Sequence, residues 1–196
     1  MKITKRSKKR IASTKEYIDA LQEKHSKLCV VRLDMGYKKP YSEEMSFKEV
    51  HKDINRNLNN RRNNQSIYEH NVGYILKKEY TEDKGIHIHG IFIFDGQKVQ
   101  KDVHKADQIG KYWEEQITKG KGTYYNCNKN SYPEHGIGMI DYSDKEKREN
   151  LDKAISYLCK DEQHINEDLD KNFRSIVRGA KPKKKTNAGR PRSNKF

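Results

Sequence analysis

Two short segments near the middle of the chain have the alternating pattern of β-strands and are separated by a turn. The segments are residues 72–80 and 87–94, and the turn between them is Thr81–Gly85. Because successive side chains of a strand point to opposite faces, His87 and His89 are predicted to share one face. The opposite face carries the apolar side chains Ile86, Ile88, Phe92 and Phe94. The pattern therefore predicts a β-hairpin with one core face and one face that carries two histidines.

The other periodic segments predict helices and strands on both sides of this hairpin. A serine followed three residues later by glutamate, the capping-box pattern, opens two of the expected helices, at Ser46 and at Ser143. In chain order we predict a helix at 11–25, a strand at 28–35, a helix at 47–62, the hairpin, a helix at 99–117, a loop at 119–131, a strand at 136–141 and a helix at 144–163. This order predicts an α+β domain in which helices flank an antiparallel sheet.

Positive charge is concentrated at the two ends of the chain. The formal net charge is +14. Residues 1–10 contain six Lys or Arg and no acid, and residues 180–196 contain seven and no acid. We predict a basic N-terminal arm at 1–10 and a disordered basic tail at 180–196 that hold a polyanion, with nucleic acid favoured. The alternative is that both ends are solvated and only keep the protein soluble.

The basic tail supplies six candidate DNA contacts: Lys181, Lys183, Lys184, Lys185, Arg190 and Arg192. The segment Gly189-Arg190-Pro191 resembles the core of an AT-hook, which lies in the minor groove of A·T-rich DNA. The arginine that precedes the glycine in an AT-hook is absent here, because position 188 is Ala188. A generic basic tail is therefore the alternative interpretation.

Composition excludes several other classes of protein. No run of about 18 apolar residues is present, so neither a transmembrane helix nor a membrane partner is expected. The N-terminus lacks the apolar segment of a secretory signal. Cys29, Cys127 and Cys159 show no Cys-x-x-Cys spacing, which favours a reduced protein in the cytoplasm.

The hairpin also predicts a carboxylate beside the two histidines. If Tyr80 pairs with Ile86 across the turn, Glu79 lies opposite His87 on the same face. Two imidazoles and one carboxylate suit Mn²⁺ or Mg²⁺ at a phosphate, and zinc is also chemically possible. The alternative for the histidine pair is a structural role, with both rings half-buried and hydrogen-bonded.

The last predicted helix carries a tyrosine that its packing does not require. Its buried stripe consists of Leu151, Ala154, Ile155 and Leu158, and at 100° per residue Tyr157 and Lys160 lie together, away from that stripe. A phenol beside an ammonium group is more easily ionised and can attack phosphorus. The lysine can offset charge on the phosphate in the transition state. The alternative is an ordinary surface tyrosine with a surface lysine.

The order and spacing of these motifs resemble the HUH endonuclease superfamily of rolling-circle replication initiators, relaxases and single-strand transposases. His87-Ile88-His89 resembles the family's His-hydrophobic-His motif, and Tyr157-Leu158-Cys159-Lys160 resembles its Tyr-x-x-Lys motif. With Val31-Arg32-Leu33-Asp34, the segment 157–163 is most similar to the replication endonucleases of filamentous phages (the gene II type of inoviruses). The resemblance covers about residues 28–178.

The resemblance implies a nuclease domain at 11–179 of ferredoxin-like type, with a sheet of about five antiparallel strands and flanking helices. It implies that His87, His89 and Glu79 hold a divalent metal, Mg²⁺ or Mn²⁺. Tyr157 would attack a DNA phosphate, leaving a free 3′-OH and a 5′-phosphotyrosine bond, and Lys160 would neutralise the phosphate. Some family members have a second catalytic tyrosine one helical turn away, where this chain has Lys153, so one catalytic tyrosine is expected.

These implications predict a replication initiator endonuclease that nicks single-stranded origin DNA and later religates it, as in rolling-circle replication. The chain has no helicase motif, so a helicase of the bacterial host is an expected partner. One alternative keeps the same chemistry, in a single-strand transposase or a mobilisation relaxase. The other alternative is a non-catalytic DNA- or RNA-binding protein, such as a repressor, on the same fold.

Overall fold

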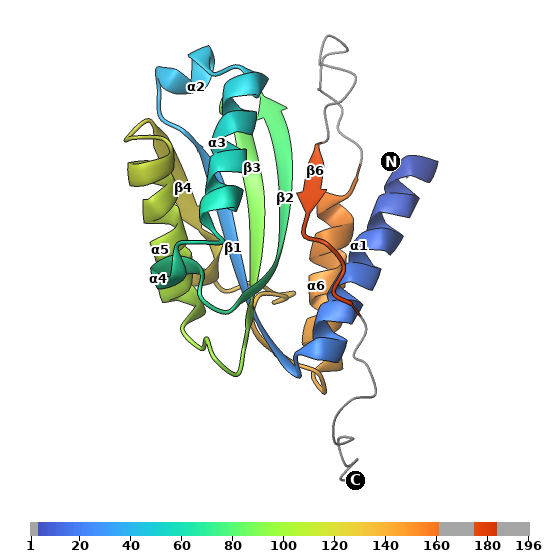
Figure 1. Ribbon diagram of the computed structural model, residues 1–196. Helices are drawn as coiled ribbons and strands as arrows, with labels where there is room; N and C mark the ends of the chain where they lie inside the picture. The colour runs from blue at the N-terminus through green and yellow to red at the C-terminus, as the bar shows by residue number, and fades with distance from the viewer. Residues whose placement is uncertain (1–3, 161–174, 184–196) are drawn as a thin grey trace.

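The computed structural model of the chain describes residues 4–160 and 175–183. These residues form one antiparallel sheet between two layers of helices (Figure 1). The fold is therefore α+β, as the order of the predicted elements indicates.

The sheet contains six strands among the described residues, where the sequence pattern gave four and the family resemblance about five. The two long central strands are β1 (Lys27–Tyr37) and β3 (Gly85–Asp95). The order across the sheet is β4-β1-β3-β2-β6, and β5 pairs with the first half of β1, beside β4. The remaining strands are β2 (Asn71–Thr81), β4 (Gly122–Asn126), β5 (Gly138–Asp141) and β6 (Ile176–Arg178).

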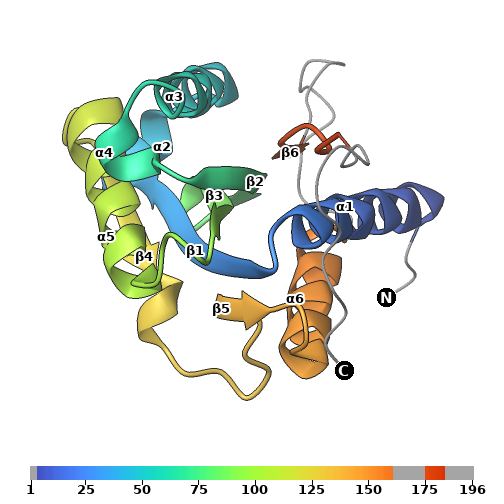
Figure 2. The ribbon, with the colours of Figure 1, turned by 60° about the horizontal axis from the view of Figure 1, so that its bottom comes forward.

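Different helices cover the two faces of the sheet (Figure 2). One face is covered by α3 (Phe47–Asn60), α4 (Gln65–Tyr68) and α5 (Asp102–Tyr112), which continues as the π-helical turn η1 (Trp113–Ile117). The other face is covered by α1 (Lys5–Lys24) and α6 (Lys145–Leu158). The short elements α2 (Tyr41–Glu44) and the 3-10 turn η2 (Cys127–Lys129) lie in the connections.

Each face of the sheet has its own apolar core, because both are buried under helices. In β1, Val31 and Leu33 pack under α3 and α5, whereas Val30 packs under α1 and α6. The second core also contains Ile91 and Ile93 of β3, whose side chains alternate in phase with His87 and His89. The histidines therefore lie on the α1/α6 face, beyond the part of it that these helices bury.

The predicted hairpin is confirmed, and the turn between its strands ends at Gly85, a position that favours glycine. Gly85 has φ +63°, and a Cβ at this position would lie 2.2 Å from the carbonyl oxygen of Ser42. A residue with a side chain is disfavoured there by both the backbone conformation and the contact. The glycine thus fixes the start of β3 against the loop that contains α2.

The first helix begins at Lys5 and not at the predicted residue 11, so residues 5–10 of the predicted basic arm are helical. Thr4 caps α1, and its side chain accepts a hydrogen bond of 3.2 Å from the backbone N–H of Ser7. Ser7 is itself buried. Lysine and arginine are good helix formers, so a basic segment after a threonine cap continues the helix without an apolar residue.

The loop predicted at 119–131 is wrong for Gly122–Asn126, which form the edge strand β4. This strand pairs with the second half of β1, from Leu33 to Tyr37. The sequence of β4 is too short and too polar to show strand periodicity, and its pairing depends on a partner about 90 residues earlier. The strand β6 was missed for the same reason.

The last predicted helix is present, but it begins and ends at other residues than predicted. The cap is Asp144 rather than Ser143, because the Asp144 side chain accepts a 3.0 Å hydrogen bond from the backbone N–H of Lys147. The helix α6 ends at Leu158 rather than at 163, and Lys160 follows it. Residues 161–163 of the prediction lie outside the described part of the chain. Among the described residues, none of the helices has the length and hydropathy of a membrane span.

Candidate functional site

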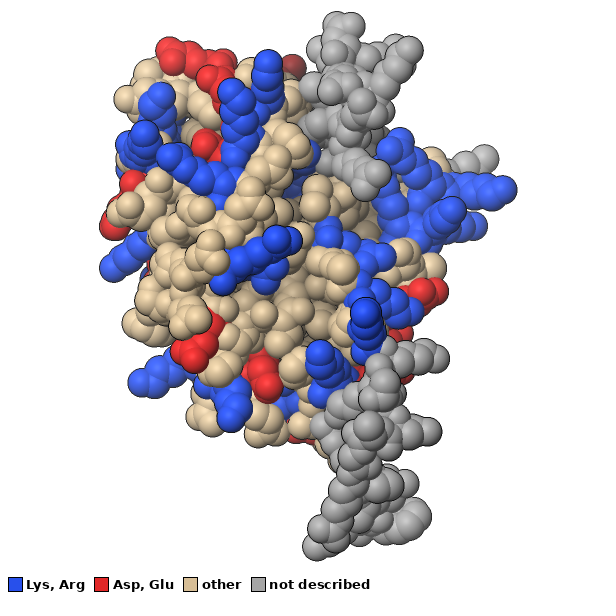
Figure 3. Space-filling view, in the orientation of Figure 1, with Lys and Arg blue, Asp and Glu red and all other residues tan. Residues whose placement is uncertain are grey.

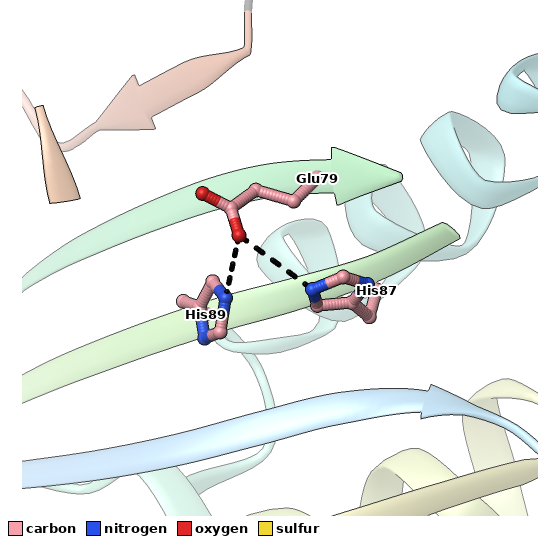
Figure 4. A group of neighbouring side chains, drawn as sticks. All are labelled: Glu79, His87 and His89. Atoms are coloured by element: carbon pink, nitrogen blue, oxygen red, sulfur yellow. Dashed lines mark hydrogen bonds and ion pairs between the residues drawn. The ribbon is translucent and has the colours of Figure 1, made fainter. Parts of the chain in front are cut away.

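The predicted pairing of Glu79 with His87 is confirmed. In the β2–β3 hairpin Tyr80 lies opposite Ile86 and Glu79 lies opposite His87. The three side chains Glu79, His87 and His89 therefore share one face of two neighbouring strands (Figure 4). All three are partly buried: the side chains of His87 and His89 are 13% and 19% exposed.

The carboxylate and the two imidazoles converge on one point. Glu79 Oε2 lies 3.0 Å from Nε2 of His89 and 3.6 Å from Nε2 of His87 (Figure 4). The two rings are nearly perpendicular, with an interplanar angle of 88° and centroids 5.1 Å apart. Within the described ranges, this is the one group of His, Cys, Asp and Glu side chains whose spacing fits a metal site.

The other nitrogen of each histidine ring is held by a hydrogen-bond acceptor. Nδ1 of His89 lies 2.6 Å from Oδ1 of Asp34, on the neighbouring strand β1. Nδ1 of His87 lies 3.2 Å from the carbonyl oxygen of Gly85. A proton on each Nδ1 leaves Nε2 as the atom that can bind a metal, and such partners commonly orient metal-binding histidines.

Asp34 is a site residue that the sequence reasoning did not assign. It lies on the same face of β1 as Val30 and Arg32, and it pairs across the sheet with His89. The polar positions of a central, otherwise apolar strand were the available signal. The contact itself depends on the pairing of β1 with β3, which the sequence pattern did not specify.

The charges of the site stabilise one another. The two histidines that face the carboxylate, His87 and His89, lower the pKa of Glu79, and Lys77 forms an ion pair with the other carboxylate oxygen. Burial lowers the pKa of His89, but the hydrogen bonds to Asp34 and Glu79 outweigh it and raise that pKa to about 9. Without a metal, His89 is therefore protonated at neutral pH, and a metal at Nε2 would take the place of that proton.

The donor set fits a divalent ion. The three candidate ligand atoms all lie within 4.8 Å of one another. Two ligands at about 2.1 Å from a shared Mg²⁺ are separated by at most about 4.2 Å, so only small side-chain movements are required. Mixed nitrogen and oxygen ligands leave further coordination positions for water or phosphate oxygens. Glu79, His87 and His89 could thus hold Mn²⁺ or Mg²⁺.

Tyr157 lies on α6, and its side chain points away from the helix's buried stripe, as predicted. Leu151, Ile155 and Leu158 are buried, whereas Tyr157 is 70% exposed. The ammonium group of Lys160 lies 5.1 Å from the centre of the Tyr157 ring. The pair is therefore together in space, although Lys160 follows the helix instead of belonging to it.

An open groove connects the tyrosine with the strand that carries Asp34. The groove has a volume of about 680 Å³ and is lined by residues of α6 together with Lys15, Arg32, Glu134 and Lys160. Arg32 precedes Asp34 by two positions on β1, which corresponds to about 6.6 Å along a strand. The metal-site residues and the tyrosine thus lie on the same side of the sheet.

The candidate DNA contacts of the tail are only partly described. Lys181 and Lys183 lie against the acidic side of α1, where Nζ of Lys181 is 3.4 Å from Oε2 of Glu16. The positive charge of Lys181 is thus partly balanced within the protein. Four of the predicted contacts lie outside the described residues: Lys184, Lys185, Arg190 and Arg192.

One known protein family matches the part of the chain that contains these site residues. The family model of the YagK/YfjJ C-terminal domain matches residues 4–175. The chain belongs to this family. No curated protein and no solved structure matches the chain. The match to the YagK/YfjJ C-terminal domain includes Asp34, Glu79, His87, His89 and Tyr157. The family description names no activity, so the function is argued from the chemistry of the site.

Proposed function

We propose that this YagK/YfjJ C-terminal domain is a metal-dependent endonuclease that cuts single-stranded DNA with one catalytic tyrosine. The observation that carries the proposal is the convergence of Glu79 and both histidine Nε2 atoms on the same side of the sheet as the exposed Tyr157. A structural histidine pair requires no exposed tyrosine and lysine on the same side of the sheet. Phosphoryl transfer from DNA to a protein requires both a group that polarises the phosphate, such as a metal, and a nucleophile, such as a phenol.

The metal would be held by Glu79, His87 and His89, with Asp34 and the Gly85 carbonyl orienting the two rings. When bound, a divalent ion polarises the phosphate and lowers the cost of the negative charge that develops on its oxygens. The remaining steps are carried by side chains of this chain. Lys77 and Glu79 form an ion pair that fixes the carboxylate in the site.

The Tyr157 hydroxyl is the proposed nucleophile. Its oxygen forms a bond to phosphorus, and the bond from phosphorus to the 3′ oxygen breaks. The phenol proton leaves to solvent, and the departing 3′ oxygen takes up a proton from solvent. The products are a DNA end with a free 3′-OH and a 5′-phosphate linked to Tyr157. Lys160, beside the tyrosine ring, supplies positive charge to the phosphate. Attack by a 3′-OH on the phosphotyrosine reverses these steps and religates the strand.

Cutting and religation of this kind serve the initiation of rolling-circle replication, in which the free 3′-OH primes synthesis. The substrate is then single-stranded DNA at an origin, and a helicase of the bacterial host supplies unwinding in the cytoplasm. The same chemistry also serves a single-strand transposase or a mobilisation relaxase. A replication initiator, a transposase and a relaxase would use the same site residues, and they would differ in the DNA that they recognise.

A binding protein without activity is the alternative from another class. The basic side chains of α1 favour contact with nucleic acid whether or not a strand is cut (Figure 3). A covalent protein–DNA adduct separates the two functions, because a binding protein forms none.

The test is incubation of the protein with Mn²⁺ and single-stranded oligonucleotides of random sequence that carry a fluorophore at the 3′ end. The label must be on the 3′ fragment, because that fragment keeps the 5′-phosphate bound to the tyrosine. Wild-type protein should give a labelled band on a denaturing gel, and Tyr157→Phe should give none.

Tyr142→Phe is the matched control, because Tyr142 and Tyr157 are both 70% exposed and Tyr142 follows β5 instead of lying on α6. This control should form the adduct as the wild type does. An adduct of equal yield in Tyr157→Phe, or no adduct in wild type with Mn²⁺, would reject the nuclease assignment.

A further inference from the structure

Arg32 is a charged side chain on the site face that has no hydrogen-bond or ion-pair partner among the described residues. Its Nε atom is buried and makes no hydrogen bond. The neighbouring acid on its own strand, Asp34, has one carboxylate oxygen 2.6 Å from Nδ1 of His89. A buried donor of a charged group without an acceptor is costly, and native proteins seldom keep one without a reason.

The backbone at Arg32 is held firmly in place. Its N–H donates a 2.7 Å hydrogen bond to Oδ1 of Asn128, whose side-chain amide donates to the carbonyl of Val30 and to Asp102. Asn128 is buried in the turn η2 after β4. The guanidinium group thus extends from a fixed point of β1, which favours a positioned binding group over a mobile surface arginine.

The surroundings of Arg32 indicate what would satisfy it. Arg32 lines the groove that also contains Tyr157 and Lys160. Three carboxylates line it as well: Glu134, which pairs with Lys153, Asp152, which pairs with Arg148, and Glu149. The guanidinium group has donors in a planar arrangement that matches two oxygens of a phosphate. A phosphodiester in this groove would satisfy the arginine and lie beside the tyrosine at the same time.

We propose that Arg32 binds a backbone phosphate of single-stranded DNA in the groove between β1 and α6. This proposal rests on the proposed function and deepens it, because it gives the path by which the strand reaches Tyr157. Arg32 is a binding and positioning residue, and the attacking atom is still the Tyr157 oxygen. The phosphate supplies anionic oxygens to a donor that the described residues leave unsatisfied.

The test measures binding of fluorescein-labelled oligothymidylate by anisotropy, in EDTA, so that no strand is cut. Arg32→Gln should lower the affinity about tenfold, as expected for the loss of a hydrogen bond between charged groups. The slope of log affinity against log salt concentration should become shallower by about 0.7, the contribution of one phosphate of a single strand. Arg32→Lys should keep that slope and lose part of the affinity.

Arg56→Gln is the matched control, because it removes the same charge from α3, which covers the opposite face of the sheet. It should bind like the wild type, apart from a small effect of net charge. Should Arg32→Gln melt far below the wild type, Arg32→Met, which keeps an apolar side chain of similar length, takes its place. Wild-type affinity and an unchanged salt slope in a folded Arg32 variant would overturn the proposal.

The assay separates this proposal from the proposed function. One outcome is that wild type forms no adduct while Arg32→Gln still lowers the affinity for oligothymidylate and its salt dependence. In that case phosphate binding by Arg32 is supported and the nuclease assignment is rejected. If wild type forms the adduct and the folded Arg32 variant binds DNA normally, only the role of Arg32 is rejected.

Discussion

Asp34 is the residue on which the orientation of the His89 ring depends. Its carboxylate holds Nδ1 of His89 at 2.6 Å and directs Nε2 toward Glu79. Burial raises the pKa of Asp34, but the hydrogen bond and the charge of His89 lower it by more, so Asp34 is ionised at neutral pH. A charged acceptor on the far side of a histidine ring makes the ring a stronger metal ligand.

Asp34→Asn should therefore weaken Mn²⁺ binding without removing a ligand. We expect a loss of about 10- to 100-fold in affinity, the usual effect of a partner that orients a metal-binding histidine. Titration calorimetry with Mn²⁺ measures this. Asp53→Asn is the control, because Asp53 lies on α3, away from the site, and accepts its hydrogen bond from the Tyr37 hydroxyl. Equal affinity in wild type and Asp34→Asn would show that Asp34 does not orient His89.

At the scale of elements, the β2–β3 hairpin positions the candidate metal site, and Gly85 positions the hairpin. The carbonyl of Gly85 accepts the hydrogen bond from His87, and its positive φ turns the chain into β3. Gly120 also has a positive φ, of +84°, but a Cβ at Gly120 would meet nothing within 4 Å. The two glycines thus allow the backbone effect to be separated from the contact with Ser42.

Gly120→Ala should cost about 1–2 kcal/mol, the penalty of a side chain in the left-handed region. Gly85→Ala should cost about 1–3 kcal/mol more, because its Cβ also overlaps the Ser42 carbonyl oxygen. Urea unfolding measures both changes. Gly85→Ala should in addition weaken Mn²⁺ binding, since the His87 acceptor moves, and Gly120→Ala should not. Equal stability of the two variants would contradict this account of the hairpin.

The elements that the sequence predicted are those determined by local patterns. The hairpin register followed from alternation and a short turn, and the capping box at Ser46 is present with both of its hydrogen bonds. The strand β4, the strand β6 and the contact between Asp34 and His89 were missed because each depends on a partner distant in the sequence. The same limit explains why Glu79 was predicted and Asp34 was not.

At the scale of the whole molecule, the candidate functional residues lie on one side of the sheet. Each side has an apolar core, and the α1/α6 side also carries the candidate metal ligands and the groove with Tyr157. Basic side chains gather over the N-terminal half of α1, on that same side (Figure 3). A single strand that reaches the site would therefore approach a positively charged surface.

Truncation after Lys183 tests whether the basic tail adds to this surface. The truncation removes Lys184, Lys185, Arg190, Arg192 and Lys195. We expect weaker binding to oligothymidylate and a shallower salt dependence, because fewer counterions are released from the DNA. A truncation variant should keep its melting temperature, since residues 179–183 still contact Tyr74 and α1. An unchanged salt slope would show that the removed tail does not hold DNA.

The most direct test of the central claim is to identify the residue that carries DNA after reaction with Mn²⁺. The adduct is digested with nuclease and trypsin, and mass spectrometry searches for nucleotide-bearing peptides. The account predicts a nucleotide 5′-phosphate on the peptide Ala154–Lys160, which trypsin releases after Lys153 and Lys160 and whose tyrosine is Tyr157. A nucleotide on another residue, or none on any peptide, would contradict it.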